Sequence, residues 1–179
     1  MKELETQRLI LRRLRKTDAP LIFYTWANDP EVTKFLTWEH HTHISQTNFI
    51  LAIWLAEYEN DNCYRWLIER KSDGRAIGMI DVVNYHAEMD GAPEIGYCSG
   101  REFWGSGYMT EACKAVVQEL FDSGFETILI SAANENVGSN RVIQKCGFKL
   151  YKTEQKAISE YKPDTNVTVN CYRIDKATL

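Results

Sequence analysis

The sequence lacks a hydrophobic run long enough to cross a membrane. Its longest uninterrupted apolar stretch, Phe49–Ala56, falls far short of the roughly 20 residues that a membrane-spanning helix needs. The N-terminal residues do not resemble a secretory signal peptide either. We therefore expect a cytoplasmic protein that does not associate with membranes.

Cysteine patterns typical of disulfide or zinc scaffolds are also missing. No two cysteines have C-x-x-C spacing, and their number is odd. They are Cys63, Cys98, Cys113, Cys146 and Cys171. Three histidines lie close together at His40, His41 and His43, but no H-E-x-x-H motif accompanies them. We predict reduced thiols and no bound metal.

The sequence has no excess of positive charge. The formal net charge is −4 at pH 7, and no run of basic residues exceeds two, which argues against nucleic acid as a partner. The acidic balance mildly favours a cationic partner such as an amine. The chain has 179 residues, of which 44% are hydrophobic and 26% charged, and it shows no linker, repeat or low-complexity tract. These features predict a single domain over residues 1–179.

Strand and helix patterns alternate along the chain. Strands are expected at about 7–13, 63–70, 76–84, 92–99, 127–131, 147–155 and 167–175. Helices are expected at about 18–27, 30–36 and 43–59, from near Tyr108 to about 122, and at about 136–145. The apolar positions of the 43–59 helix include Ile44, Ile50, Ile53, Trp54 and Ala56.

A glycine-rich turn joins the strand at 92–99 to the helix that begins near Tyr108. Gly105 and Gly107 leave the backbone amides of this turn bare, and amides at a helix N-terminus favour phosphate. An ordinary turn would have the same pattern. The familiar nucleotide loops do not fit, because the sequence has no G-x-x-x-x-G-K-[ST] and Thr110 stands where G-x-G-x-x-G needs its third glycine.

Two motifs nevertheless make the chain similar to the GNAT acetyltransferase superfamily, in its Rim-type ribosomal-protein N-terminal acetyltransferase branch. The stretch Trp104–Met109 lies over the family's coenzyme A loop, Gln/Arg-x-x-Gly-x-Gly/Ala, with Met109 replacing a small residue. The second motif, Asn…Ser…Lys-x-Gly-Phe, matches Asn136, Ser139, Lys145, Gly147 and Phe148. The opening segment from Thr6 to Val32 also resembles the family, so the similarity covers almost the whole chain.

This resemblance implies an α+β (α/β/α layered) GNAT fold. Its mixed, mostly antiparallel sheet of about 6–7 strands would be splayed at the acetyl-CoA site and flanked by about 4 helices. Acetyl-CoA would be the acetyl-donor co-substrate, without a metal. Its pyrophosphate would lie on the amides of Gly105, Ser106, Gly107, Tyr108, Met109 and Thr110, and its pantetheine arm along Tyr97, Cys98 and Ser99. Asn136 and Ser139 would complete the site, although Asn136 is equally suited to cap a helix.

The proton donor and the base cannot be carried over directly from relatives, because this chain has other residues at the usual positions. Many relatives have a tyrosine where this chain has Ile143, so Ser139 is the nearest matching hydroxyl, with Tyr108 and Tyr97 in reserve. Ser139 could instead bond the backbone of its helix. Some relatives place a glutamate where this chain has Ser131. Glu94 and Asp81 are therefore the best carboxylates for proton transfer, unless they are merely solvated or capping groups.

The acceptor is predicted only as a class. The resemblance favours a primary amine, either a protein N-terminus, possibly ribosomal, or a small polyamine- or aminoglycoside-like amine. Aromatic and acidic residues suited to its pocket are Trp26, Phe35, Trp38, Tyr161, Glu31 and Glu39. The sequence leaves open a monomer or a homodimer. It also leaves open a catalytically impaired acyl-CoA-binding module or sensor, which the unusual Ile143, Ser131 and Met109 suggest.

Overall fold

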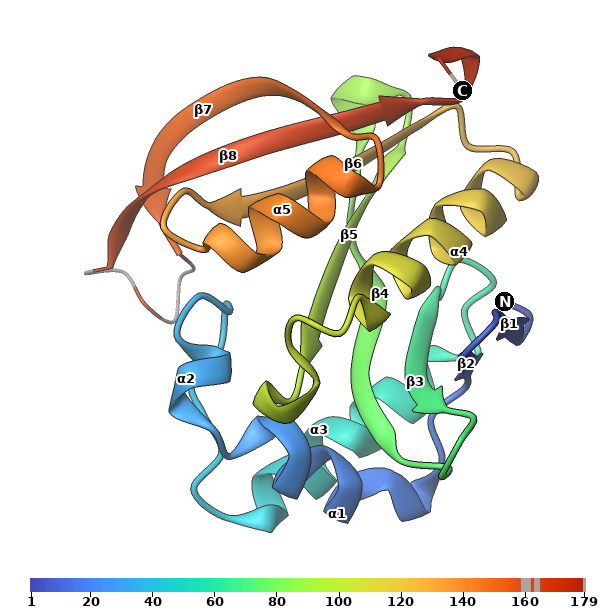
Figure 1. Ribbon diagram of the computed structural model, residues 1–179, viewed down its shortest axis with the longest axis vertical. Coiled ribbons are helices and arrows are strands. Elements are labelled where there is room, and N and C mark those ends of the chain that lie inside the picture. The colour runs from blue at the N-terminus through green and yellow to red at the C-terminus, as the bar shows by residue number, and fades with distance from the viewer. Residues whose placement is uncertain (159–161, 163–164, 179) are drawn as a thin grey trace.

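The computed structural model describes residues 1–158, 162 and 165–178, and it contains one eight-stranded sheet (Figure 1). The strand order is β1-β2-β3-β4-β5-β6-β8-β7, and every described neighbouring pair except β5 and β6 is antiparallel. The strands are β1 (Leu4–Glu5), β2 (Leu9–Arg12), β3 (Arg65–Arg70), β4 (Ala76–His86), β5 (Ala92–Ser99), β6 (Thr127–Ala133), β7 (Lys149–Ala157) and β8 (Asn166–Asp175). The mixed sheet is confirmed, with one strand more than predicted.

The described residues form five α-helices, as many as the ranges expected from the sequence, whereas the family resemblance implied about 4. They are α1 (Ala19–Ile22), α2 (Pro30–Thr33), α3 (Ile44–Glu57), α4 (Tyr108–Asp122) and α5 (Val137–Lys145). The helix predicted at 18–27 is divided, because α1 passes directly into a π-helical turn at Phe23–Ala27. None of the helices in the described ranges is long and apolar enough to cross a membrane.

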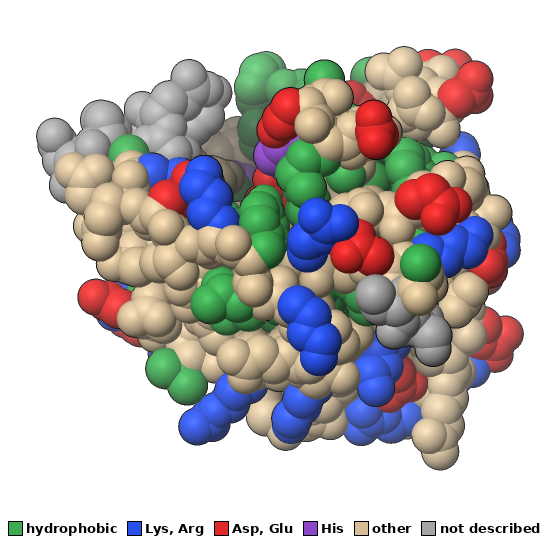
Figure 2. All heavy atoms as spheres, turned by 90° about the horizontal axis from the view of Figure 1, so that it is seen from above, with side chains coloured by type: hydrophobic (Ala, Val, Ile, Leu, Met, Phe, Trp, Pro, Cys, Tyr) green, Lys and Arg blue, Asp and Glu red, His purple; other side chains and the backbone are tan. Residues whose placement is uncertain are grey.

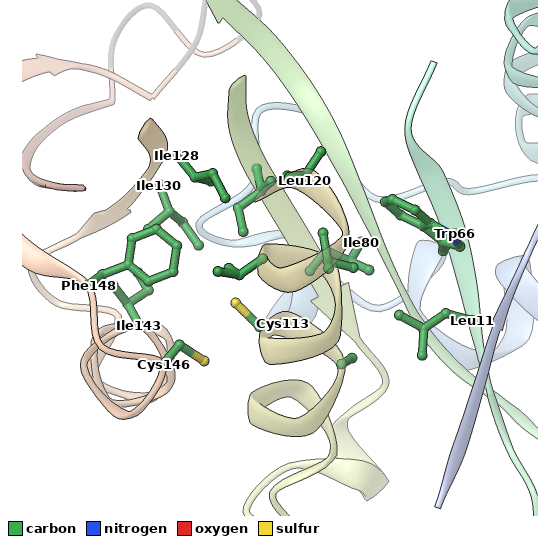
Figure 3. Close-up of a cluster of buried hydrophobic side chains, with 14 of the residues drawn as sticks. Leu11, Trp66, Ile80, Cys113, Leu120, Ile128, Ile130, Ile143, Cys146 and Phe148 are labelled. Atoms are coloured by element: carbon green, nitrogen blue, oxygen red, sulfur yellow. The ribbon is translucent and has the colours of Figure 1, made fainter. Parts of the chain in front are cut away.

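Helices cover both faces of the sheet, which confirms the α/β/α layers. On one face α4 and α5 enclose the larger core, where side chains of both helices point toward those of the strands (Figure 3). On the other face α1 and α3 lie over a second core that contains Ile22, Leu51 and Met79. In β3, Trp66 and Ile68 belong to the first core and Leu67 to the second, because successive side chains of a strand point to opposite faces.

The apolar positions of the long helix α3 do not all face the sheet. Of those named from the sequence, Ile53 is 42% exposed and Ala56 is also exposed. The buried residues of α3 are Thr47 and Leu51, four residues apart. Apolar residues occur all around this helix, so periodicity alone does not select the face that meets the sheet.

The sheet opens between β5 and β6. These parallel strands pair only at Glu94 with Leu129 and at Ile95 with Ile130. Beyond this point β5 continues to pair with β4, while β6 follows β8 as far as Ala133. The strands therefore diverge toward their carboxyl ends, and this wedge is the predicted splay.

Candidate active site

The glycine turn lies where β5 leads into α4. Gly105 has a φ of 74° and Gly107 a φ of 79°, both in the left-handed region. This conformation costs other residues about 1–2 kcal/mol, which explains glycine at both positions. Gly107 is the N-cap of α4 and has no side chain to satisfy the first amides of the helix.

The amides of this turn are available to a ligand. Within the described part of the chain, no backbone amide from Gly105 to Thr110 donates a hydrogen bond, and the first that does is Glu111 N, to Gly107 O at 3.1 Å. Gly105, Ser106 and Gly107 are exposed to solvent. A row of free N–H groups at the positive end of a helix dipole is the arrangement that binds a diphosphate.

An arginine that the sequence analysis did not single out supports the loop. Arg8 donates from Nη1 to Ser106 O at 3.0 Å and from Nε to Glu111 at 2.6 Å. Glu111 also accepts hydrogen bonds from the Arg8 amide and the Thr6 hydroxyl. Burial raises the pKa of Glu111, but these bonds outweigh it and hold the pKa below its usual value. The ion pair fixes the loop to the start of β2 and places a cation beside the free amides.

Tyr108 does not contribute its side chain to the predicted reaction centre. Its ring lies under the Arg8 guanidinium, whose central carbon is 4.4 Å from the ring centroid, and packs at the edge of the larger core. Tyr108 is not among the residues that line the cleft described next, whereas Ser139 and Glu94 are. Only the amide of Tyr108 remains well placed for a role in the site.

A cleft of about 640 Å³ occupies the wedge between β5 and β6. Most of the site residues predicted outside the glycine loop line it together: Asp81, Glu94, Tyr97, Cys98, Asn136 and Ser139. Ser99 does not, and its carbonyl accepts a hydrogen bond from Trp104 Nε1 at 2.9 Å. Beyond Ile95, the edge of β5 that faces β6 pairs with no strand among the described residues. An extended ligand can therefore pair with it as an added strand does.

Ser139 and Tyr97 form a hydroxyl pair in this cleft. Their oxygens are 2.9 Å apart, and the Tyr97 hydroxyl also donates to the Ser139 carbonyl at 3.2 Å. Burial raises the pKa of Tyr97 well above its usual range, so its hydroxyl stays protonated at neutral pH. Asn136 is the N-cap of α5 and accepts a hydrogen bond from the Ser139 amide at 3.1 Å. This is the helix-capping role that the sequence also allowed.

Glu94 is held between two hydrogen-bond partners. Ser131 Oγ donates to one carboxylate oxygen at 2.6 Å, and His86 Nε2 lies at hydrogen-bond distance, 2.8 Å, from the other. The side chain of Glu94 is 19% exposed. Ser131, which replaces a glutamate of some relatives, thus orients a carboxylate that the neighbouring strand supplies. The sequence analysis did not identify His86.

Asp81 also lines the cleft, but it is already paired. Arg65 donates to it from Nε at 3.0 Å, and Arg65 also binds Glu57. Burial raises the pKa of Asp81 above its usual value, although Arg65 opposes the shift. Because Arg65 neutralises Asp81, Glu94 is the better base of the two carboxylates.

The far side of the cleft is aromatic. Trp26, Phe35 and Trp38 line it as expected, and Trp54 of α3 joins them. The acidic candidates lie elsewhere: Glu31 is exposed in the first turn of α2, and the Glu39 carboxylate is 3.5 Å from Lys162 Nζ. Neither of these glutamates lines the cleft. The predicted Tyr161 lies outside the described residues.

Comparison with known sequences gives a consistent result. Residues 8–149 match the profile of the acetyltransferase (GNAT) domain family. An uncharacterized N-acetyltransferase of Bacillus subtilis, YoaA, is 33% identical over 176 residues, which cover 97% of this chain and 96% of the relative.

Solved structures share the fold. RimL, a ribosomal-protein α-N-acetyltransferase in complex with coenzyme A, superposes with a TM-score of 0.84 at 19% identity, covering 97% of this chain and 98% of that one. The microcin self-immunity acetyltransferase MccE, in complex with acetyl-CoA and AMP, gives a TM-score of 0.81 at 22% identity, with 95% and 93% covered.

Proposed function

The chain belongs to the GNAT acetyltransferase family, and we propose that it catalyses direct transfer of the acetyl group of acetyl-CoA to a primary amine in the cleft between β5 and β6. One observation carries the proposal: the Glu94 carboxylate and the Ser139–Tyr97 hydroxyl pair line the same cleft. A base and an acid at one site are what acetyl transfer to an ammonium group needs.

The coenzyme site follows from the free backbone groups. The amides of residues 105 to 110 bind the pyrophosphate, and Arg8 adds a positive charge beside them. The open edge of β5 at Tyr97 and Cys98 holds the pantetheine arm and directs it into the wedge. Acetyl-CoA supplies an acetyl group that is already activated as a thioester.

Glu94 accepts a proton from the bound ammonium, because only a neutral amine is nucleophilic. Ser131 and His86 fix both oxygens of this carboxylate, so its orientation is set before the acceptor binds. Ser139 donates a proton to the departing sulfur, and Tyr97 supports that hydroxyl with its own. Tyr97 thus provides the phenol that Ile143, buried in the core, cannot.

The acceptor is a protein N-terminus or a small amine. Its amine points to Glu94, and the group that carries it lies against Phe35, Trp38 and Trp54. Aromatic rings favour both apolar groups and cations, which suits an ammonium ion. RimL, which shares this fold, is an α-N-acetyltransferase of a ribosomal protein, and this similarity supports a protein N-terminus within this class.

Release of coenzyme A thiol from acetyl-CoA tests the proposal. Peptides, polyamines and aminoglycosides are offered to the wild type and to Glu94→Gln, with Glu39→Gln as a matched variant outside the cleft. We expect at least one acceptor to stimulate thiol release. Glu94→Gln should lower kcat/KM by about 100-fold or more, and Glu39→Gln should leave it nearly unchanged. Thiol release that no acceptor stimulates would overturn the proposal in favour of an acyl-CoA-binding module.

A further inference from the structure

A second, smaller cavity of about 120 Å³ adjoins the cleft. The two share four lining residues: Glu94, Ile130, Ser131 and Lys156. His86 and Glu88 border only the smaller cavity. The Glu94 carboxylate therefore belongs to the wall between the place where the acceptor binds and a separate polar space.

A chain of hydrogen bonds leads outward from this carboxylate. His86 Nε2 lies 2.8 Å from Glu94, and His86 Nδ1 lies 2.9 Å from Glu88. Side-chain exposure rises along the chain, from 19% at Glu94 to 24% at His86 and 72% at Glu88. Acidic and basic side chains are interspersed on the face that Figure 2 shows. The chain thus connects the mostly buried carboxylate to solvent.

We infer that His86 is a positioning residue that relays the proton taken up by Glu94 to solvent. The inference rests on the proposed role of Glu94. An ammonium loses two protons when it becomes an amide: one ends on the thiol of coenzyme A, and the other must leave the site. The His86 tautomer that carries its proton on Nδ1 accepts the proton of Glu94 at Nε2 and releases its Nδ1 proton to water at Glu88. The imidazole ends the cycle neutral with its proton on Nε2, and a ring flip or proton exchange with solvent restores the first tautomer.

The charges around His86 suit this exchange near neutral pH. Burial lowers the pKa of His86, but its bonds to Glu94 and Glu88 outweigh burial and raise the pKa above its usual value. The nearby lysines of β7 are compensated, because Lys152 and Lys156 both pair with Glu154. The other titratable side chains that line the smaller cavity are Tyr151 and Cys171.

Chemical rescue tests the relay. The turnover of the wild type, His86→Ala and Glu88→Gln is measured from pH 6 to 9 with the best acceptor of the thiol-release panel. We expect His86→Ala to lower kcat by roughly 10-fold or more, with little change in KM for acetyl-CoA. Added imidazole should restore much of the rate. Glu88→Gln should have a small effect, since its carboxylate is largely exposed.

Two results would overturn the inference while leaving the proposed function intact. The first is a His86→Ala variant with the kcat of the wild type. The second is a His86→Ala variant that still binds acetyl-CoA but has a low kcat that added imidazole does not restore. If His86→Ala does not fold, an NMR titration of the His86 imidazole replaces rescue: its pKa should fall in Glu94→Gln, and an unchanged pKa overturns the relay. If the wild type acetylates no amine at all, the proposed function fails and the relay with it.

Discussion

Substitution of Gly107 by glutamate should weaken coenzyme binding. Gly107 has a φ of 79°, so any side chain there strains the backbone by about 1–2 kcal/mol. An added Cβ would lie 3.5 Å from Arg8 Nη2, an ordinary contact that allows the side chain to fit. The new carboxylate would then neutralise Arg8 and face the pyrophosphate. Steric exclusion is therefore a minor part of the expected loss.

The size of the effect follows from the charges. Two unit charges about 4 Å apart repel by about 1 kcal/mol in water and by about 4 kcal/mol near a protein surface. Backbone strain is the same with and without the ligand, so it lowers the stability of the protein and not its affinity, and the expected loss of binding free energy is the repulsion alone, about 1–4 kcal/mol. Because each 1.4 kcal/mol corresponds to about a tenfold change, the Kd for acetyl-CoA should rise between about 5-fold and about 700-fold.

Calorimetric titration with acetyl-CoA measures this change. Gly107→Gln has the same backbone strain without the charge, so its difference from Gly107→Glu isolates the electrostatic part, which added salt should weaken. Gly74→Ala is the matched control, because Gly74 has a φ of 68° in the turn between β3 and β4, and no atom lies within 4 Å of an added Cβ. The Gly74→Ala variant should lose stability and keep the wild-type affinity for acetyl-CoA. Wild-type affinity in Gly107→Glu would refute the loop assignment.

Local signals made the centre of the fold predictable. The strand predicted at 92–99 is β5 with the same bounds, and α4 begins at Tyr108 as expected. The glycine turn at residues 105–107 separates the two elements and marks the start of α4. β1 could not be predicted, because its two residues, Leu4 and Glu5, are too few to show alternation.

Contacts between distant residues were the part of the site that the sequence could not provide. The loop residues and Ser139 stand out by motif, but Tyr97 meets Ser139 across 42 positions, and Arg8 meets Glu111 across 103. His86 is only eight positions from Glu94. A register shift between Val82 and Asn84 offsets the pairing of β4 with β5, so that counting along a regular hairpin does not bring these two side chains together.

Three further predictions concern the hydroxyl pair, a buried ion pair and His86. Ser139→Ala should lower kcat by about 10- to 100-fold and keep the affinity for acetyl-CoA, so an unchanged kcat would exclude Ser139 as the donor. Arg65→Met should reduce the free energy of unfolding in urea by about 3–5 kcal/mol, because Asp81 would be left buried and unpaired; a loss below about 1 kcal/mol would show that water reaches Asp81. Burial lowers the pKa of His86, but its carboxylate partners outweigh burial and raise this pKa in the folded state. Protonated His86 therefore stabilises the folded protein. This stabilisation is complete below the usual pKa of 6.5 and is lost as the pH rises through the folded pKa. The difference in melting temperature between the wild type and His86→Gln should therefore be largest near pH 6 and smaller at pH 8. A difference that grows with pH would mean that these carboxylates do not hold His86 protonated.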